Sequence, residues 1–315
     1  MENFAAPVNV DRAPNQWSGR IDGDTAEHLR WHQQVAALDE NTAPGAVALL
    51  GFASDAGVKR NAGRPGAAEG PAALRAALGS MAIHVPRGIV DAGDVVVHGD
   101  ELESGQHRLA EAVTALHRRG TLPIVLGGGH ETAYGSFMGL HAAVDGARIG
   151  ILNLDAHFDL RSAPRRSSGT PFLDIAQHLQ GTGEAFNYAI VGISRPNNTG
   201  ILFDKAEQLS VRYLLDEESQ SLSEVSGFVA DFLAEIDVLY LTIDLDVLPA
   251  SVAPGVSAPA GYGVPYEVIH GICRQVAASG KLGLVDVVEL NPHFDVDART
   301  ARSAARLIHT LASVG

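Results

Sequence analysis

The sequence is poor in the features that mark membrane proteins and disulfide-stabilised proteins. It contains a single cysteine, Cys273, which cannot form a disulfide within the chain. No apolar run approaches the roughly 20 residues that a membrane-spanning helix requires, and residues 1–45 contain no apolar leader segment. We therefore expect a cytoplasmic protein that does not enter a membrane.

Basic residues are also scarce. The chain has 23 Lys and Arg against 37 Asp and Glu, which gives a formal net charge of -14. Nucleic acids and anionic membranes are bound by clustered positive charge, so we expect neither as a partner. A small anionic substrate would need a local group of arginines.

The chain does have enough apolar material for one large core. Hydrophobic residues make up 46% of its 315 residues, and α/β folds of this size commonly form one domain around one sheet. Residues 1–44 lack a clear period and predict an irregular N-terminal arm, anchored by Trp17 and Trp31, that packs on the domain or on a neighbouring subunit. Residues 45–315 are the predicted catalytic core of a single domain, 1–315.

Apolar runs and helical patterns alternate along the core. About eight runs rich in Val, Ile and Leu predict buried strands: 46–52, 89–91, 122–126, 149–154, 188–193, 211–215, 238–243 and 282–288. Helical patterns occupy 72–81, 106–119, 132–143, 172–179, 222–234, 265–278 and 298–312. This alternation predicts a three-layer α/β/α fold with a parallel sheet of about eight strands. The long loops that should surround the carboxyl edge of the sheet are 54–71, 161–171, 194–199 and 248–263.

Three short polar segments directly follow such runs, and each carries residues that bind metal ions. Residues 127–131 read Gly-Gly-Gly-His-Glu, residues 155–159 read Asp-Ala-His-Phe-Asp, and residues 244–246 read Asp-Leu-Asp. The carboxyl ends of parallel strands lie at one edge of a sheet, which is where ligands bind in such folds. We therefore expect these three segments to meet, although they are far apart in the sequence.

The residue types in these segments favour two metal ions. Residues two apart at a strand end share a face, so the Asp and His side chains of each segment can point to one side. Each segment alone could be ordinary loop polarity, but together they would bury four aspartates that repel one another without cations. A hard donor set without thiolate suits Mn²⁺, and two adjacent ions would lower the pKa of a shared water toward neutrality. The six candidate ligands are His130, Asp155, His157, Asp159, Asp244 and Asp246.

In combination, these segments resemble the ureohydrolase superfamily, the dimanganese arginases, agmatinases and formimidoylglutamases. The resemblance covers roughly residues 45–312 and includes Val-Glu-Leu-Asn-Pro at 288–292, similar to the family stretch whose glutamate contacts the amidine or guanidinium end of the substrate. It implies an arginase-like fold, a trimer or hexamer, and two Mn²⁺ ions per subunit. The implied ligands are His130, Asp155, Asp159 and Asp244 for one ion, and Asp155, His157, Asp244 and Asp246 for the other.

Within this group the sequence is most similar to the formimidoylglutamases. The glycine-rich loop at 57–71 and the Gly-Thr-Pro-Phe stretch at 169–172 look like theirs. Arginases carry a histidine where this chain has Phe172, which argues against an arginase with its proton-shuttling histidine. The resemblance implies Mn²⁺-dependent hydrolysis of N-formimidoyl-L-glutamate to L-glutamate and formamide, a reaction of histidine degradation.

The charge of that substrate gives a second argument for the same choice. The molecule presents a cationic formamidine at one end and two carboxylates at the other, and guanidinium groups bind carboxylates bidentately. Each arginine of the rim loops could equally be a solvated loop charge, whereas as a set they favour a diacid. The predicted substrate-binding residues are Arg60, Asn61, Arg64, Arg161, Arg195 and Glu289, and Asn197 and Asn198 could add hydrogen bonds.

The predicted catalytic residues are Asp159 and Glu289. Glu289 would hold the formamidine by its NH groups, and Asp159 would pass a proton from the attacking water to the departing nitrogen. Two other interpretations stay open. The chain could be an agmatinase, a guanidinobutyrase or an arginase-type hydrolase that releases urea, or a catalytically silent metal-bound protein that senses an amino acid.

Overall fold

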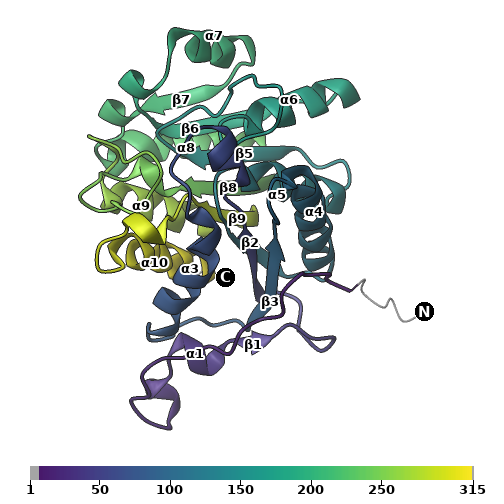
Figure 1. The fold of residues 1–315 in the computed structure, drawn as a ribbon, viewed down its shortest axis with the longest axis vertical. Helices are drawn as coiled ribbons and strands as arrows, with labels where there is room; N and C mark the ends of the chain where they lie inside the picture. Colours follow the sequence, from purple (N-terminus) through teal and green to yellow (C-terminus); the bar gives the residue numbers. More distant parts are fainter. Residues whose placement is uncertain (1–6, 314–315) are drawn as a thin grey trace.

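Nine parallel strands form one sheet at the centre of the molecule (Figure 1). The computed structural model describes residues 7–313. In the sheet the strands lie in the order β1-β3-β2-β4-β9-β8-β5-β6-β7. Because every neighbouring pair is parallel, all carboxyl ends lie at the same edge of the sheet. Their bounds are Ala36–Ala37 for β1, Val47–Ala53 for β2, Ile89–Val96 for β3, Leu122–Leu126 for β4, Ile149–Leu154 for β5, Asn187–Ile193 for β6, Arg212–Leu215 for β7, Val238–Asp244 for β8 and Leu282–Val288 for β9.

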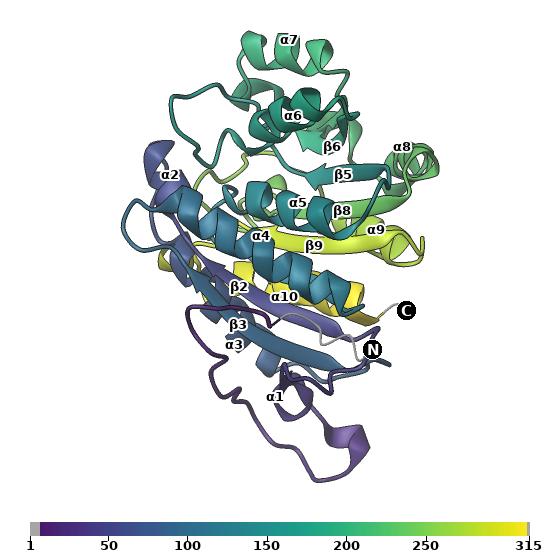
Figure 2. The same ribbon diagram turned by 90° about the vertical axis from the view of Figure 1, so that its right-hand side faces the viewer.

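Helices cover both faces of this sheet (Figure 2). One face carries α4 (Leu102–Arg118), α5 (Thr132–Ala143), α6 (Pro171–Thr182) and α7 (Gly200–Gln208), and the other carries α3 (Gly70–Gly79), α8 (Leu222–Glu235), α9 (Tyr266–Ala277) and α10 (Arg299–Ser313). The successive residues Leu49 and Leu50 of β2 belong to different apolar cores, one on each face. Burial on both faces explains why the strands read as continuous apolar runs.

The predicted three-layer α/β class is confirmed, and all eight predicted strands are present. The ninth strand is β1, which pairs with β3 at the edge of the sheet through Ala36 opposite Val90. It has only two residues, both exposed, and the apolar stretch around it at 35–38 is so short that the sequence did not reveal it. Among the described residues no helix is both long and apolar enough to cross a membrane.

The N-terminal arm is more regular than expected, because it contains β1 and a short helix, α1 (Trp31–Gln34). Trp31 is fully buried, and its Nε1–H donates a hydrogen bond to His309 Nδ1 at 3.0 Å. The Nε1–H of Trp17 donates to Asp91 Oδ2 at 2.8 Å. The prediction that these two tryptophans anchor the arm is therefore confirmed.

Two further helices lie where none was predicted. Helix α2 (Ala56–Arg60) interrupts the loop at 54–71, which was expected to have no helix. Helix α7 buries only Leu202 and Ala206, while Ile201 beside them is 70% exposed. A helix with so narrow an apolar face leaves a weak periodic signal in the sequence.

Candidate metal centre

Four neighbouring strands deliver polar side chains to the carboxyl edge of the sheet. These are β4, β9, β8 and β5, which are adjacent in the sheet although β9 comes last in the chain. His130 follows β4, the turn at 155–159 follows β5, Asp244 ends β8, and Glu289 follows β9. The structure thus brings the three predicted metal-binding segments together and places Glu289 among them.

His130 stands at the centre of the first group of side chains. Its Nδ1 lies 3.1 Å from Asp155 Oδ2, 3.1 Å from Asp159 Oδ2 and 3.0 Å from Asp244 Oδ2. This buried atom is aligned for a hydrogen bond with none of them, whereas Nε2 lies 3.1 Å from Thr242 Oγ1. A hydrogen bond from Nε2–H to Thr242 leaves the Nδ1 lone pair available, as in histidines that bind metals.

A second group surrounds His157. Its Nδ1 lies 3.0 Å from Asp246 Oδ2 and 3.6 Å from Asp155 Oδ1. Asp155 therefore contributes one carboxylate oxygen to each group and has the geometry of a shared ligand. Asp244 directs Oδ2 toward His130 and accepts a hydrogen bond from the Asp246 N–H on Oδ1 at 2.8 Å.

The two groups bury several carboxyl groups close together, an arrangement that bound cations would stabilise. Burial and the negative charges of Asp246 and Asp155 raise the pKa of Asp244 well above its usual range, and burial and Asp155 also raise the pKa of Asp159. Burial lowers the pKa of His130, but its carboxylate neighbours outweigh that effect and raise it. Divalent cations relieve such a crowding of carboxylates.

The donor atoms fit two divalent ions such as Mn²⁺. They are carboxylate oxygens and imidazole nitrogens, and the buried Nδ1 of His130 is left without a hydrogen-bond partner in the described chain. The single thiol, Cys273, is buried in the apolar core on α9, so the thiol is not part of either group. Oxygen-rich sites with a few histidines suit Mn²⁺ better than metals that prefer sulfur.

The turn after β5 is fixed by Asn198. The Oδ1 of Asn198 accepts a hydrogen bond from the Phe158 N–H at 3.1 Å, and its Nδ2 donates to Ala156 O and Ser194 O at 2.9 Å each. We expected Asn198 as a possible substrate contact, but its amide is buried and occupied by the backbone of this turn. Its neighbour Asn197 is exposed and lines a separate cavity.

Phe172 packs against the first group of side chains. Its buried ring stacks on Tyr188 with centroids 4.5 Å apart and meets the ring of His130 edge-on at 5.3 Å. The Tyr188 hydroxyl accepts a hydrogen bond from Asn153 Nδ2, which also donates to Asp155 Oδ2 at 2.9 Å. This position therefore holds a packed apolar ring that cannot carry a proton.

Asp159 and Glu289 adopt backbone conformations that are unusual outside glycine, with φ of 49° and 66°. Such conformations cost about 1–3 kcal/mol each and persist only where the surroundings hold them. Glu289 is held by hydrogen bonds of 2.8 Å from its N–H to Gly128 O and from the His130 N–H to its Oε1. Its Oε2 is buried without a partner in the described chain, and burial together with the Glu131 carboxyl raises the pKa of Glu289 to about 8.

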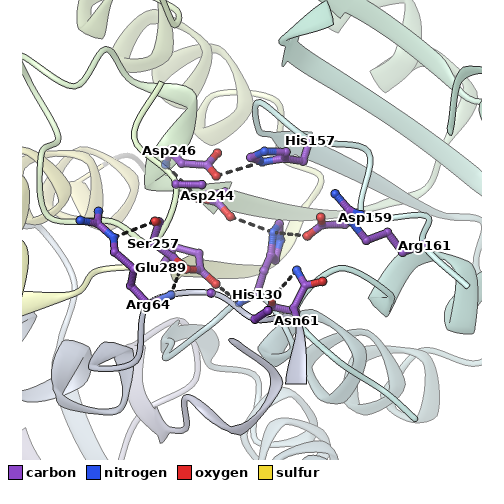
Figure 3. A pocket seen from close by; sticks show the side chains of 14 residues that line it. Asn61, Arg64, His130, His157, Asp159, Arg161, Asp244, Asp246, Ser257 and Glu289 are labelled. Atoms are coloured by element: carbon purple, nitrogen blue, oxygen red, sulfur yellow. Dashed lines mark hydrogen bonds and ion pairs between the residues drawn. The ribbon is translucent and has the colours of Figure 1, made fainter. Parts of the chain in front are cut away.

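The two groups open into a polar cavity of about 300 Å³ (Figure 3). Three of the four predicted rim loops, 54–71, 161–171 and 248–263, contribute to its wall. Figure 3 shows Arg64 and Arg161 on opposite sides of the candidate ligands. The loop residues that line the cavity through polar side chains are Asn61, Arg64, Arg161, Ser168 and Ser257, of which the two serines were not predicted because a lone loop serine carries no pattern.

Comparison with known proteins agrees with this geometry. Residues 45–313 match the sequence model of the Arginase family. The chain belongs to the arginase family. It is 56% identical to a formimidoylglutamase of Rhodococcus jostii (strain RHA1) over 99% of this chain and 97% of that one, and 54% identical to a formimidoylglutamase of Nocardia farcinica (strain IFM 10152) over 95% and 96%. It also resembles a crystal structure of Trypanosoma cruzi formiminoglutamase with Mn²⁺, with a TM-score of 0.76, 25% identity and coverage of 85% and 93%.

In this arginase-family chain, two of the predicted substrate-binding arginines do not line the cavity. Arg60 pairs through Nε with Asp100 Oδ1 and through Nη1 with Glu103 Oε1, both at 2.7 Å. Arg195 is exposed, with its guanidinium 5.4 Å from the centre of the Phe203 ring. Neither Arg60 nor Arg195 therefore lies with Arg64 and Arg161 at the cavity. Arg60 is bound by two carboxylates instead.

Arg64 lines the cavity and also connects its own loop to residues 256–257 and 291–294. Its Nε donates to Ser257 O at 2.9 Å, its Nη2 donates to Val256 O, and its guanidinium lies 3.9 Å from the centre of the Phe294 ring. Asn291 Nδ2 donates to the carbonyl of Arg64 at 3.0 Å. These contacts fix the side chain at the wall of the cavity.

Proposed function

We propose that this arginase-family protein is a formimidoylglutamase, which hydrolyses N-formimidoyl-L-glutamate to L-glutamate and formamide. The observation that carries the proposal is the 56% identity, over 99% of the chain, to a relative of that name. The cavity supports the same substrate, because it joins the candidate metal ligands to Arg64 and Arg161. A substrate with a cationic amidine at one end and two carboxylates at the other suits this distribution of charge.

The proposed cofactor is a pair of Mn²⁺ ions in each subunit. The shared carboxylate of Asp155 and the available Nδ1 of His130 support a two-ion site. When bound, the ions would polarise the substrate and lower the pKa of a coordinated water so that hydroxide is available near neutral pH. The proposed ligands are His130, Asp155, Asp159 and Asp244 for one ion, and Asp155, His157, Asp244 and Asp246 for the other.

Glu289 and Asp159 are the proposed catalytic residues. The buried Oε2 of Glu289 accepts hydrogen bonds from the NH groups of the formamidinium, whose positive charge favours the carboxylate form of Glu289. Asp159 has Oδ2 toward His130, so Oδ1 takes a proton from the attacking water and returns it to the glutamate nitrogen as the C–N bond breaks. Phe172 takes no part in this transfer.

The glutamate end of the substrate is assigned to the walls of the cavity. Arg64 and Arg161 can each bind a carboxylate. Asn61, in the same loop as Arg64, connects to the loop of Arg161, because its Nδ2 donates to Ser168 Oγ at 3.1 Å. Arg60 supports the loop through its ion pairs. For Arg195 to contact the substrate, the side chain would have to leave Phe203.

The second candidate is a hydrolase that releases urea, because the same six ligands and Glu289 would serve a guanidinium group. Mn²⁺-loaded protein is incubated separately with formimidoylglutamate, arginine, agmatine and guanidinobutyrate, and glutamate, formamide and urea are measured. We expect glutamate and formamide from the first compound and no urea from the others. Urea from arginine without glutamate from formimidoylglutamate would favour the second candidate. Turnover no faster than with Mn²⁺ alone for all four compounds would favour a catalytically silent amino-acid-binding protein.

A further inference from the structure

Glu131 is a buried carboxyl that the proposed reaction does not use. It follows His130 directly, and its side chain is fully buried. Its Oε1 accepts hydrogen bonds from Ser54 Oγ at 2.7 Å and from the Gly57 N–H at 2.8 Å. Both donors belong to the start of the loop after β2, so this one carboxyl joins the metal-ligand turn to a different loop.

The side chain of Glu131 occupies space that is open only because residues 57 and 129 are glycines. A Cβ at Gly57 would lie 2.6 Å from Glu131 Cδ, and a Cβ at Gly129 would overlap Glu131 Oε2. The turn and the loop also bond directly, since the Gly129 N–H donates to Ser54 O at 3.0 Å. The side chain of Glu131 is therefore enclosed between the two segments that it connects.

The loop that Glu131 holds forms one wall of the cavity. Gly57 lies in the first turn of α2, and the N–H of Asn61 at the end of that helix donates to Gly57 O at 2.9 Å. Asn61 and Arg64 then line the cavity. The position of Gly57 thus bears directly on where Asn61 stands relative to His130, and Arg64 follows three residues later in the same loop.

We propose that Glu131 is a positioning residue that sets the distance between the metal centre and the glutamate-binding wall of the cavity. It acts through Ser54 and Gly57 on the loop that carries Asn61 and Arg64, and it need not touch the substrate. The identity of the bound ligand rests on the proposed function, whereas the mechanical link does not. Loss of these hydrogen bonds of Glu131 weakens binding of the glutamate end more than it slows the chemistry at the formamidine. The metal ligands keep hydrogen bonds that do not involve Glu131, such as those of His130 with Thr242 and of Asp155 with Asn153.

Two variants of Glu131 separate its hydrogen bonds from its charge. Glu131→Ala removes both hydrogen bonds, whereas Glu131→Gln keeps an oxygen that accepts them. In the Mn²⁺-loaded enzyme we expect Glu131→Ala to raise KM for formimidoylglutamate and Kd for L-glutamate about ten-fold, with a smaller change in kcat. Manganese content stays unchanged, and Glu131→Gln restores most of the affinity. Glu224→Gln, which makes the same chemical change at the exposed start of α8, serves as the matched control.

Several outcomes would overturn the proposal. These are an unchanged KM and glutamate Kd in Glu131→Ala, or equal losses in the Ala and Gln variants together with loss of manganese. If Glu131→Ala does not fold, Ser54→Ala removes one of the two donors to Glu131. We expect the Kd of this variant for L-glutamate to rise, and an unchanged Kd would overturn the proposal.

Amide hydrogen exchange separates this proposal from the assignment of the substrate. Without any substrate, the amides of residues 57–66 should exchange faster in Glu131→Ala than in the wild type, because the Gly57 N–H has lost its acceptor. Unchanged exchange there would overturn the link whatever the substrate is. Failure of the wild type to hydrolyse formimidoylglutamate would instead overturn the proposed function and leave the exchange result to decide the role of Glu131.

Discussion

Glu289 uses one carboxylate oxygen to accept the His130 N–H and keeps the other buried in the cavity wall. Glu289→Gln should retain the first hydrogen bond and lose the charge that pairs with the formamidinium. We expect kcat/KM to fall about 100-fold, as for other groups that stabilise charge in a transition state, with two Mn²⁺ still bound per subunit. Steady-state kinetics combined with metal analysis test this. Wild-type turnover in a fully loaded variant would remove Glu289 from the reaction.

Arg161 lines the cavity from the loop after β5, whereas Arg165 in the same loop pairs with Asp100 outside it. Arg161→Ala should raise KM for formimidoylglutamate about ten-fold or more with a smaller change in kcat, because a bidentate contact to a carboxylate is lost. Arg161→Lys should recover only part of the affinity, since an ammonium group cannot bind bidentately. Arg165→Ala is the control, and an equal effect there would point to general loop charge instead.

At this scale the sequence predicted which candidate metal ligands converge better than it predicted which loop side chains line the cavity. His157 and Asp155 are recognisable because alternation at a strand end fixes the side to which they point. The orientation of a loop side chain depends on partners elsewhere in the chain. Arg60 is bound by Asp100 and Glu103, and Asn198 is occupied by the backbone, neither of which the local sequence shows.

At the scale of elements, strand order determines which side chains meet. The runs of Val, Ile and Leu predicted eight strands, but no local pattern indicates that β9 lies between β4 and β8. Glu289 reaches the metal centre only because of that crossover. The short elements β1 and α2 were missed because contacts with distant segments stabilise them and their own residues carry no clear pattern. Strand β1 pairs with β3, and the Gly57 N–H of α2 donates to Glu131.

The junction between α1 and α10 predicts a pH-dependent stability. Burial and the nearby charges of Arg306 and His84 lower the pKa of His309 from its ordinary value of 6.5, and its neutral Nδ1 accepts the hydrogen bond from Trp31. The folded protein therefore binds fewer protons at this residue than the unfolded chain. The resulting stability is fully present above pH 6.5 and is lost as the pH falls through the lower value of the folded state.

The variant His309→Asn tests this junction. The Oδ1 of the new side chain can accept the hydrogen bond from Trp31, but the side chain does not titrate. Between about pH 7.5 and about pH 5.5, we expect Tm to fall more in the wild type than in the variant. Thermal unfolding of both proteins at both pH values measures the difference, and comparison with the wild type cancels the titration of other groups. An identical pH dependence would contradict the assignment.

For the whole molecule, Mn²⁺ should couple to folding. Ions that bind only the folded chain stabilise it by mass action, by about 2.7 kcal/mol at a hundred-fold excess over Kd. We expect Mn²⁺ to raise the Tm of chelator-treated protein, and Asp244→Asn to reduce that rise, because Asp244 Oδ2 lies 3.0 Å from His130 Nδ1. Calorimetry with and without Mn²⁺ measures both. The same rise in the variant would exclude Asp244 as a ligand.

The assembly of the molecule stays a prediction. The family resemblance implies a trimer or hexamer, and light scattering on the Mn²⁺-loaded protein would determine the number of subunits. The sequence of one chain does not show which of its surfaces pack together in an assembly.

Both tryptophans of the chain, Trp17 and Trp31, belong to the N-terminal arm. Indole emission is therefore an optical probe of this segment, while circular dichroism at short wavelength reports on the helices and the sheet as a whole. In a denaturant titration, two coincident curves would mean that the arm and the core unfold as one cooperative unit. An indole transition at lower denaturant would mean that the arm detaches first and leaves the metal-binding core folded.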